Sequence, residues 1–146
     1  MFARLEFCGA LAAIALIALP GSATRAEQGA IPDLVGTWKG ENKTVSPQKG
    51  YQVWGEKTVV ITDQMDRRFR GHFTYPQGTK HFFGVIFPDN TSFTWVASDS
   101  NGYNHGRIIA RDRIGACYVE SGKEGTAGCA VLLRQPIRDS NEEETR

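Results

Sequence analysis

The segment FRGHFTYPQGTKHFFGVIF, residues 69–87, decides the fold that we expect for this chain. Two runs rich in aromatic and β-branched residues, 69–75 and 80–87, lie on either side of Pro76-Gln77-Gly78. Aromatic and β-branched side chains favour strands, and a short connection with Pro and Gly favours a turn between antiparallel neighbours. The segment therefore predicts a β-hairpin.

Similar runs recur on both sides of this hairpin at a spacing of about ten residues, which is typical of an all-β domain. The connections are too short for crossover helices, so consecutive strands should be antiparallel neighbours, and closure of the sheet would remove its exposed edges. We predict a single antiparallel up-and-down barrel of seven to eight strands, in preference to a two-layer sandwich. The expected strands are 34–40, 53–62, 69–75, 80–87, 92–97, 103–110, 114–120 and 128–134.

Residues 41–50 interrupt the strand pattern, because they are polar and contain Pro47. We interpret this segment as a long loop after the first strand. Two interpretations remain open: a lid over one mouth of the barrel, or an ordinary exposed loop.

The two ends of the chain differ from the middle. Arg4 precedes an apolar run over 9–19, and small residues follow it, which is the pattern of a secretory signal peptide over residues 1–26. That run is shorter than the ~20 residues that cross a bilayer, so no membrane span is expected. Residues 27–135 should form the barrel, and the polar stretch 136–146 a disordered tail. We therefore expect a periplasmic or secreted protein.

Charge and cysteine content restrict the function further. The chain has 17 Lys and Arg against 16 Asp and Glu, and removal of residues 1–26 leaves fifteen of each sign. A net charge near zero argues against nucleic acid as a partner. Cys117 and Cys129 remain after cleavage, and an exported chain passes through an oxidising compartment, so we predict a disulfide between them. Two buried free thiols are the alternative.

Gly36-Thr37-Trp38 near the start of the first expected strand, with Arg134 at the end of the last, resembles the calycin superfamily of barrels, which includes lipocalins and avidins. The resemblance implies that Trp38 closes one end of the barrel and that Arg134 packs over its ring as a cation–π contact. The residue set of an avidin-type biotin site cannot be placed on this sequence. The chain also resembles a group of exported bacterial proteins with the same opening and a late Cys-Tyr-Val-Glu stretch, here 117–120, and that likeness implies no activity.

Catalytic and metal-binding patterns are not evident in the sequence. The histidines His72, His81 and His105 belong to no catalytic motif, and the familiar hydrolase and nucleotide signatures do not occur. Pairing of Tyr75 with Lys80 would place His81 diagonally from His72 on one face of the hairpin. A pair of histidines without a nearby carboxylate is a weak metal site. We therefore predict no catalytic residue, no metal and no cofactor. An enzyme that uses the barrel as a scaffold for isomerisation or cyclisation of an apolar substrate is the remaining alternative.

The aromatic residues suggest two kinds of function. We predict non-enzymatic binding of a small, partly apolar ligand in the barrel mouth, because small barrels enclose such cavities. Strand 80–87 is apolar on both faces, so its outer face predicts self-association or a protein partner. The alternative function is a protein-interaction module, such as an inhibitor of an exported hydrolase or an envelope assembly factor. The expected ligand-binding residues, which otherwise only fill a solid core, are Tyr51, Trp54, Phe83, Trp95 and Tyr103.

Overall fold

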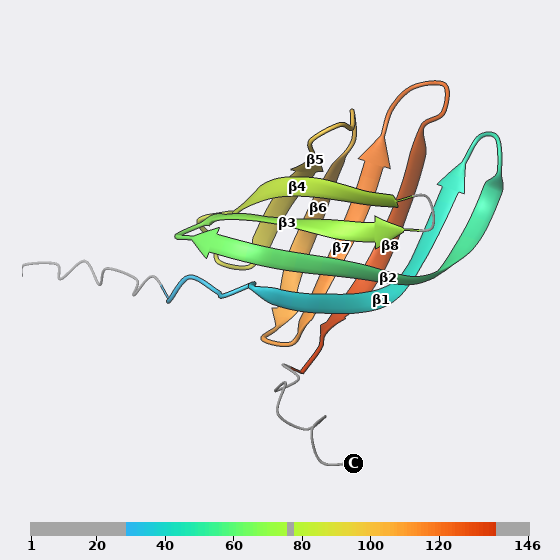
Figure 1. Cartoon of the computed structure of the whole chain (residues 1–146). Helices are drawn as coiled ribbons and strands as arrows, with labels where there is room; N and C mark the ends of the chain where they lie inside the picture. The colour runs from blue at the N-terminus through green and yellow to red at the C-terminus, as the bar shows by residue number, and fades with distance from the viewer. Residues whose placement is uncertain (1–28, 76–77, 137–146) are drawn as a thin grey trace, which may run out of the picture.

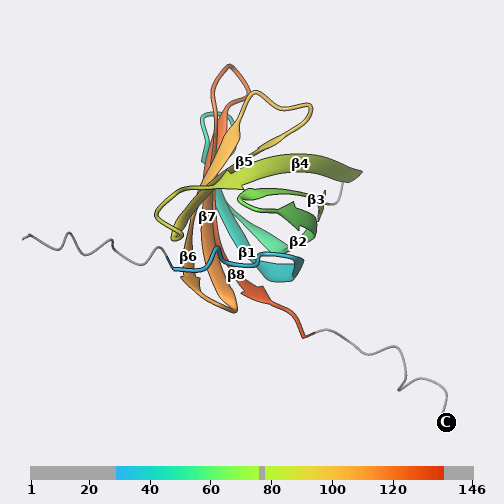
Figure 2. The same cartoon turned by 90° about the vertical axis from the view of Figure 1, so that its left-hand side faces the viewer.

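A computed structural model describes residues 29–75 and 78–136 of the chain. These residues form one closed antiparallel barrel in which each strand pairs with the next and β8 pairs with β1 (Figures 1 and 2). The predicted signal peptide and nearly all of the predicted tail lie outside the described residues. The strands are β1 (Gly36–Ser46), β2 (Gly50–Met65), β3 (Arg68–Tyr75), β4 (Gly78–Ile86), β5 (Ser92–Ala97), β6 (Tyr103–Ala110), β7 (Arg113–Glu120) and β8 (Thr126–Arg134).

The predicted fold class is confirmed: the barrel is all-β, up-and-down and eight-stranded. Most strand boundaries lie within two residues of those expected, because the aromatic and β-branched runs do coincide with strands. Over the described part of the chain, no helix has the length and apolar character needed to cross a membrane.

One half of the barrel interior is a packed apolar core. Inward-facing residues alternate with outward-facing ones along the regular parts of the strands, and in β5 the buried members are Phe93, Trp95 and Ala97. The rings of Phe93 and Trp95 stack with centroids 5.1 Å apart, and Phe82 stacks on Trp95 at the same centroid distance. Phe69 meets Trp95 edge to face at 6.2 Å. These buried rings fill the centre of this half of the barrel.

Glycines on neighbouring strands make room for these rings. A Cβ atom at Gly106 would lie 2.1 Å from Cζ of Phe93, and one at Gly84 would lie 2.6 Å from Cζ of Phe69. Heavy atoms cannot approach so closely in a close-packed interior, so the rings lie directly over bare backbone. The aromatic core therefore depends on these two glycines.

The N-terminal segment closes the packed end of the barrel. Trp38 of β1 is fully buried, and its Nε1 donates a hydrogen bond to the carbonyl oxygen of Leu34 at 2.9 Å. The guanidinium carbon of Arg134 lies 4.4 Å from the centre of the Trp38 ring, the distance of a cation–π contact. Arg134 also donates to the carbonyl of Val35 at 2.6 Å and to that of Asp33. One side chain of β8 thus holds the entering chain across the barrel end.

The prediction of a long loop over 41–50 is wrong, and so is the lid that it suggested. β1 continues to Ser46 and β2 begins at Gly50, so only a tight turn separates the two strands. The inward-facing residues here, Asn42, Thr44 and Ser46, are polar because they line a cavity. A strand with polar residues on both faces lacks the apolar alternation that identifies strands in a sequence.

The predicted disulfide between Cys117 and Cys129 is confirmed. The two residues lie directly opposite each other on β7 and β8, with Cα atoms 4.0 Å apart and both side chains on the outer face. The bridge joins neighbouring strands of the wall, and its presence is consistent with an oxidising compartment.

Candidate functional site

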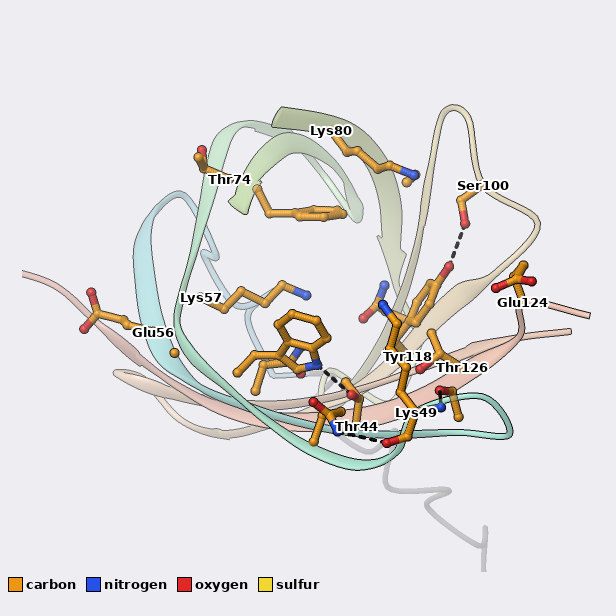
Figure 3. A pocket seen from close by; sticks show the side chains of 18 of the residues that line it. Thr44, Lys49, Glu56, Lys57, Thr74, Lys80, Ser100, Tyr118, Glu124 and Thr126 are labelled. Atoms are coloured by element: carbon orange, nitrogen blue, oxygen red, sulfur yellow. Dashed lines mark hydrogen bonds between the residues drawn. The ribbon is translucent and has the colours of Figure 1, made fainter. Parts of the chain in front are cut away.

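A cavity of about 430 Å³ opens at the barrel end opposite Trp38 (Figure 3). The walls come from the last part of β1, the first part of β2, the β3–β4 pair, and the ends of β5 to β8 that meet at this mouth. Figure 1 shows the β1–β2, β5–β6 and β7–β8 connections at the same end of the barrel. The residues that line the cavity are Asn42, Thr44, Ser46, Gln48, Lys49, Gln52, Trp54, Gly55, Glu56, Lys57, Phe73, Thr74, Lys80, Ala97, Ser100, Asn104, Tyr118, Glu124 and Thr126.

A bulge in β2 shapes this cavity. Glu41 pairs with Glu56 and the next residue, Asn42, pairs with Trp54, so Gly55 is an extra residue without an opposite partner. Such an insertion shifts the inward and outward alternation by one position. Both Trp54 and Lys57 therefore face the interior, although an unbroken strand would place residues three apart on opposite faces.

Lys57 is the most unusual group in the cavity. Its side chain extends from β2 into the ring of strands (Figure 3), and its Nζ lies 4.7 Å from the centre of the Phe73 ring. Among the described residues, Lys57 has no hydrogen bond and no carboxylate within ion-pair distance. Burial disfavours the charged ammonium and lowers the pKa of Lys57 to about 8. A negatively charged partner beside this amine would strongly stabilise its protonated form.

Two of the other charged groups that line the cavity form ion pairs. Lys80 lies 3.6 Å from a carboxylate oxygen of Asp99, and Glu56 turns away from the lumen (Figure 3) to meet Lys39 at 2.7 Å. Lys80 on β4 and Glu56 on the outer side of β2 are therefore each neutralised by a partner of opposite charge. These ion pairs leave Lys57 as the unpaired charge deeper in the lumen.

A short hydrogen-bonded cluster lies at the side of the mouth. The Tyr118 hydroxyl donates to Oε2 of Glu120 at 2.6 Å, and the Ser100 hydroxyl lies 2.7 Å from the Tyr118 oxygen and 3.2 Å from Oε1 of Glu120. Burial, together with the bond to Glu120, raises the pKa of Tyr118 to about 12. Tyr118 therefore keeps its proton at neutral pH.

Two further side chains, an indole and an amide, give the cavity both apolar and polar surface. The indole Nε1 of Trp54 donates to Oγ1 of Thr44 at 2.7 Å, which fixes the ring against the wall. Asn104 is buried and lines the cavity, and its side-chain amide makes no hydrogen bond within the described chain. Because this amide lines the cavity, it is available to a bound molecule or to water.

The five residues predicted to bind a ligand are not brought together. Trp54 lines the cavity, whereas Trp95 lies one layer deeper in the packed core, 1% exposed. Tyr51 is 90% exposed at the β1–β2 turn and does not line the cavity. Phe83 and Tyr103, 59% and 54% exposed, lie on the outer face of the barrel, because strand alternation turns them away from the lumen.

The sequence analysis missed Lys57, Phe73, Asn104 and Tyr118 as cavity residues. Phe73 was visible as an aromatic strand residue, but its inward direction follows from pairing with Val59, the partner of Trp38. Lys57, Asn104 and Tyr118 alternate along their strands with residues of the buried core, and this alternation could have identified them as inward-facing.

The histidine pair has a different register from the one predicted. Tyr75 pairs with Gly78, so His72 and His81 lie directly opposite each other with ring centroids 5.9 Å apart. Within the described ranges, no group of three or more metal-ligating side chains surrounds them. Nearby Arg70 pairs with Asp63 at 3.0 Å. These residues lie on the outer face, away from the cavity.

The lowered pKa of Lys57 predicts an unusual pH dependence of stability. Its folded-state pKa of about 8 lies below the ordinary 10.5, so between these values the unfolded chain binds more protons. The free energy of unfolding should therefore rise between pH 8 and pH 10, by on the order of 1–2 kcal/mol. Above pH 10 the raised pKa of Tyr118 acts in the opposite direction.

Urea unfolding at pH 8 and pH 10 measures this effect. Lys57→Met should remove the rise and stabilise the protein at neutral pH, because no ammonium is then desolvated. Lys80→Met is the matched control, since Lys80 has a carboxylate partner at the rim, and it should keep the rise. Equal pH dependence in both variants would contradict the burial of Lys57.

No protein-family model matches this sequence, and a comparison with curated proteins finds no match. Among solved structures, a protein of unknown function of the DUF3598 family from Nostoc punctiforme superposes with a TM-score of 0.56 at 12% sequence identity. The alignment covers 78% of this chain and 53% of that chain, so this chain spans about half the length of that protein.

Two further solved structures align with lower TM-scores and similarly low sequence identity. A redesigned β-barrel aligns with a TM-score of 0.44 and 12% identity over 70% of this chain and 92% of that chain. The S-type phycobiliprotein lyase CPES from Guillardia theta aligns with a TM-score of 0.36 and 10% identity over 70% of this chain and 89% of that chain. At such identities, similarity to the DUF3598 protein concerns the barrel fold alone.

Proposed function

We propose that this protein binds a small, partly apolar ligand in the open end of its barrel. The observation that carries this proposal is the cavity of about 430 Å³, whose wall includes the rings of Trp54 and Phe73. It also includes the Lys57 ammonium and the Asn104 side-chain amide, which form no hydrogen bond or ion pair with the described part of the chain. Ligand sites in proteins have this size, mostly apolar walls and a few polar groups that fix orientation.

The cavity chemistry favours binding over catalysis. The only chain of short hydrogen bonds beside the cavity joins, within the described residues, Ser100, Tyr118 and Glu120. The Glu120 carboxylate accepts from both hydroxyls, and the raised pKa of Tyr118 keeps that group protonated. A general base needs a pKa near the working pH, and the pKa of Tyr118 lies far above neutral pH.

Native mass spectrometry of protein purified from its natural host tests the proposal. A bound ligand adds mass to the native species, and that mass disappears on denaturation. Ala97→Leu should abolish the added mass, because Ala97 lines the cavity and a larger side chain there fills it. Val96→Leu on the outer face of the same strand is the control and should leave the added mass unchanged. Equal ligand content in both variants would place the ligand elsewhere.

A second candidate function, protein association, is favoured by the outer face. Phe83 of β4 pairs with Val96 of β5, Val96 with Tyr103 of β6, and Tyr103 with Val119 of β7. These side chains form one apolar row across four strands, and an exposed apolar row is a feature of protein interfaces. Light scattering across a concentration series tests whether two copies associate, and Phe83→Ser should then lower the mass to that of one chain.

We also propose that the chain is exported to the periplasm or secreted, and that residues 1–26 are removed. The signal-peptide pattern and the disulfide between Cys117 and Cys129 support this proposal. The intact mass of the protein recovered from the envelope or the medium tests it. A mass equal to residues 27–146 with two fewer hydrogens is expected, whereas a full-length mass from the cytoplasm would contradict it.

A further inference from the structure

The charges that line the cavity do not balance, and the imbalance points to the kind of ligand. Lys80 of β4 is paired with Asp99, and Glu56 of β2 is paired with Lys39. Two lining cations, Lys57 on β2 and Lys49 on the β1–β2 turn, have no ion pair within the described residues. Against them stands one unpaired carboxylate, Glu124 on the β7–β8 connection. Among the residues that line the cavity, these unpaired groups therefore leave one positive charge in excess.

The position of that excess charge matters as much as its sign. Lys49 lies at the turn, where its Nζ is 5.8 Å from the Trp54 ring, and Glu124 lies on an exposed loop. Both groups are in reach of solvent, so water satisfies them. Lys57 is held against the Phe73 ring inside the lumen, where an ammonium has lost much of its hydration. An anion placed beside Lys57 would offset that loss.

The groups around Lys57 suit an anion attached to a flat apolar body. The ring of Trp54 offers a face for stacking, Phe73 adds apolar surface to the wall, and the Asn104 amide offers a neutral donor. A second negative charge would meet no further unpaired cation inside the lumen and would be costly to bury. A neutral ligand would leave the ammonium unpaired. An organic monoanion fits this arrangement best.

We propose, on the basis of the ligand-binding function above, that the cavity selects a small organic monoanion with a flat apolar body, whose acidic group pairs with Nζ of Lys57. Carboxylates and sulfonates share this chemistry. Lys57 thus serves as the specificity-determining residue of the site, and the aromatic residues of the wall supply apolar contact.

A matched pair of fluorescent probes tests the proposal. 1-Anilinonaphthalene-8-sulfonate and N-phenyl-1-naphthylamine share the same rings and differ in the sulfonate group. The wild-type protein should bind the sulfonate at least tenfold more tightly than the neutral amine. Lys57→Met should remove this preference, whereas Lys57→Arg should restore it.

Controls separate the possible outcomes. Lys43→Met should keep the preference, because Lys43 lies on the outer face of β1 and does not line the cavity, and Ala97→Leu should weaken both probes by filling the cavity. Equal binding of the two probes to the wild-type protein, or an unchanged preference in Lys57→Met, would overturn the role of Lys57 while ligand binding stands. Failure of both probes to bind, or binding that Ala97→Leu leaves intact, would overturn ligand binding in the cavity itself.

The pH dependence gives a second readout that a purely structural role would not produce. An anion beside Lys57 favours the protonated amine, so its binding is coupled to proton uptake above the free-protein pKa of about 8. Affinity for the sulfonate should fall by up to about tenfold per pH unit above pH 8. Tyr118 on β7, Lys80 on β4, and Lys49 and Glu124 at the rim also line this lumen, and Lys57→Met identifies the contribution of Lys57 by removing the fall.

Discussion

Replacement of Trp38 by alanine should lower the free energy of unfolding by about 4 kcal/mol, the largest effect that we expect from a single substitution. Trp38 is fully buried, and its loss leaves a ring-sized void at the packed end of the barrel. The substitution also removes the hydrogen bond to Leu34 and the surface on which Arg134 lies. Since folded domains are stable by only about 5–15 kcal/mol, this variant should be near the limit of folding.

Urea unfolding followed by circular dichroism measures this loss. Trp54→Ala is the matched control, because Trp54 is a partly exposed indole with one hydrogen bond, to Thr44. It should cost about 1 kcal/mol, since its ring is not enclosed on all sides. Similar losses for both tryptophans would contradict the view that Trp38 closes a packed end and Trp54 lines an open one.

Replacement of Gly106 by alanine should cost about 3 kcal/mol, although it adds a single methyl group. The new Cβ would lie 2.1 Å from Cζ of Phe93 and 2.7 Å from the carbonyl oxygen of Gly115. Phe93 has little room to move, because its ring stacks on Trp95 at 5.1 Å and meets Phe69 edge to face at 6.2 Å. The clash must therefore displace several rings or the β6 backbone.

Two variants distinguish this clash from a general effect of losing glycine in a strand. Gly115→Ala on β7 should change stability by less than about 0.5 kcal/mol, because the nearest atom to its Cβ is Cδ1 of Ile109, at an ordinary 3.5 Å. In the double variant Gly106→Ala, Phe93→Leu, the smaller side chain at position 93 should relieve the clash. Its loss of unfolding free energy should therefore be smaller than the sum of the losses in the two single variants. Additive losses would show that the methyl group and the ring do not meet.

Much of the fold could be predicted because its signals are local. Aromatic and β-branched runs separated by turn residues identify strands, and short connections make consecutive strands antiparallel neighbours. The pairing of Cys117 with Cys129 followed from the absence of other candidates in the expected mature chain. The hairpin around 41–50 was missed for an equally local reason, since its lumen side is polar and gives no apolar alternation.

The candidate site was predictable only in part. Trp54 was chosen as an aromatic residue near a strand end, and it does line the cavity. Phe83 and Tyr103 were chosen on the same grounds and lie outside, because aromatic character does not reveal which face of a strand points inward. Lys57 was not considered, since a lysine in a strand is usually solvated.

The sequence by itself determined the class of structure: an all-β barrel, its approximate strands, its aromatic content and its disulfide. Only the tertiary structure decided which side chains share the lumen. The bulge at Gly55 turns both Trp54 and Lys57 inward, and closure of β8 on β1 brings distant residues to one mouth. The charge imbalance around Lys57 arises from this arrangement, because it depends on which carboxylates the closed sheet directs outward and on how far the surrounding strands exclude water.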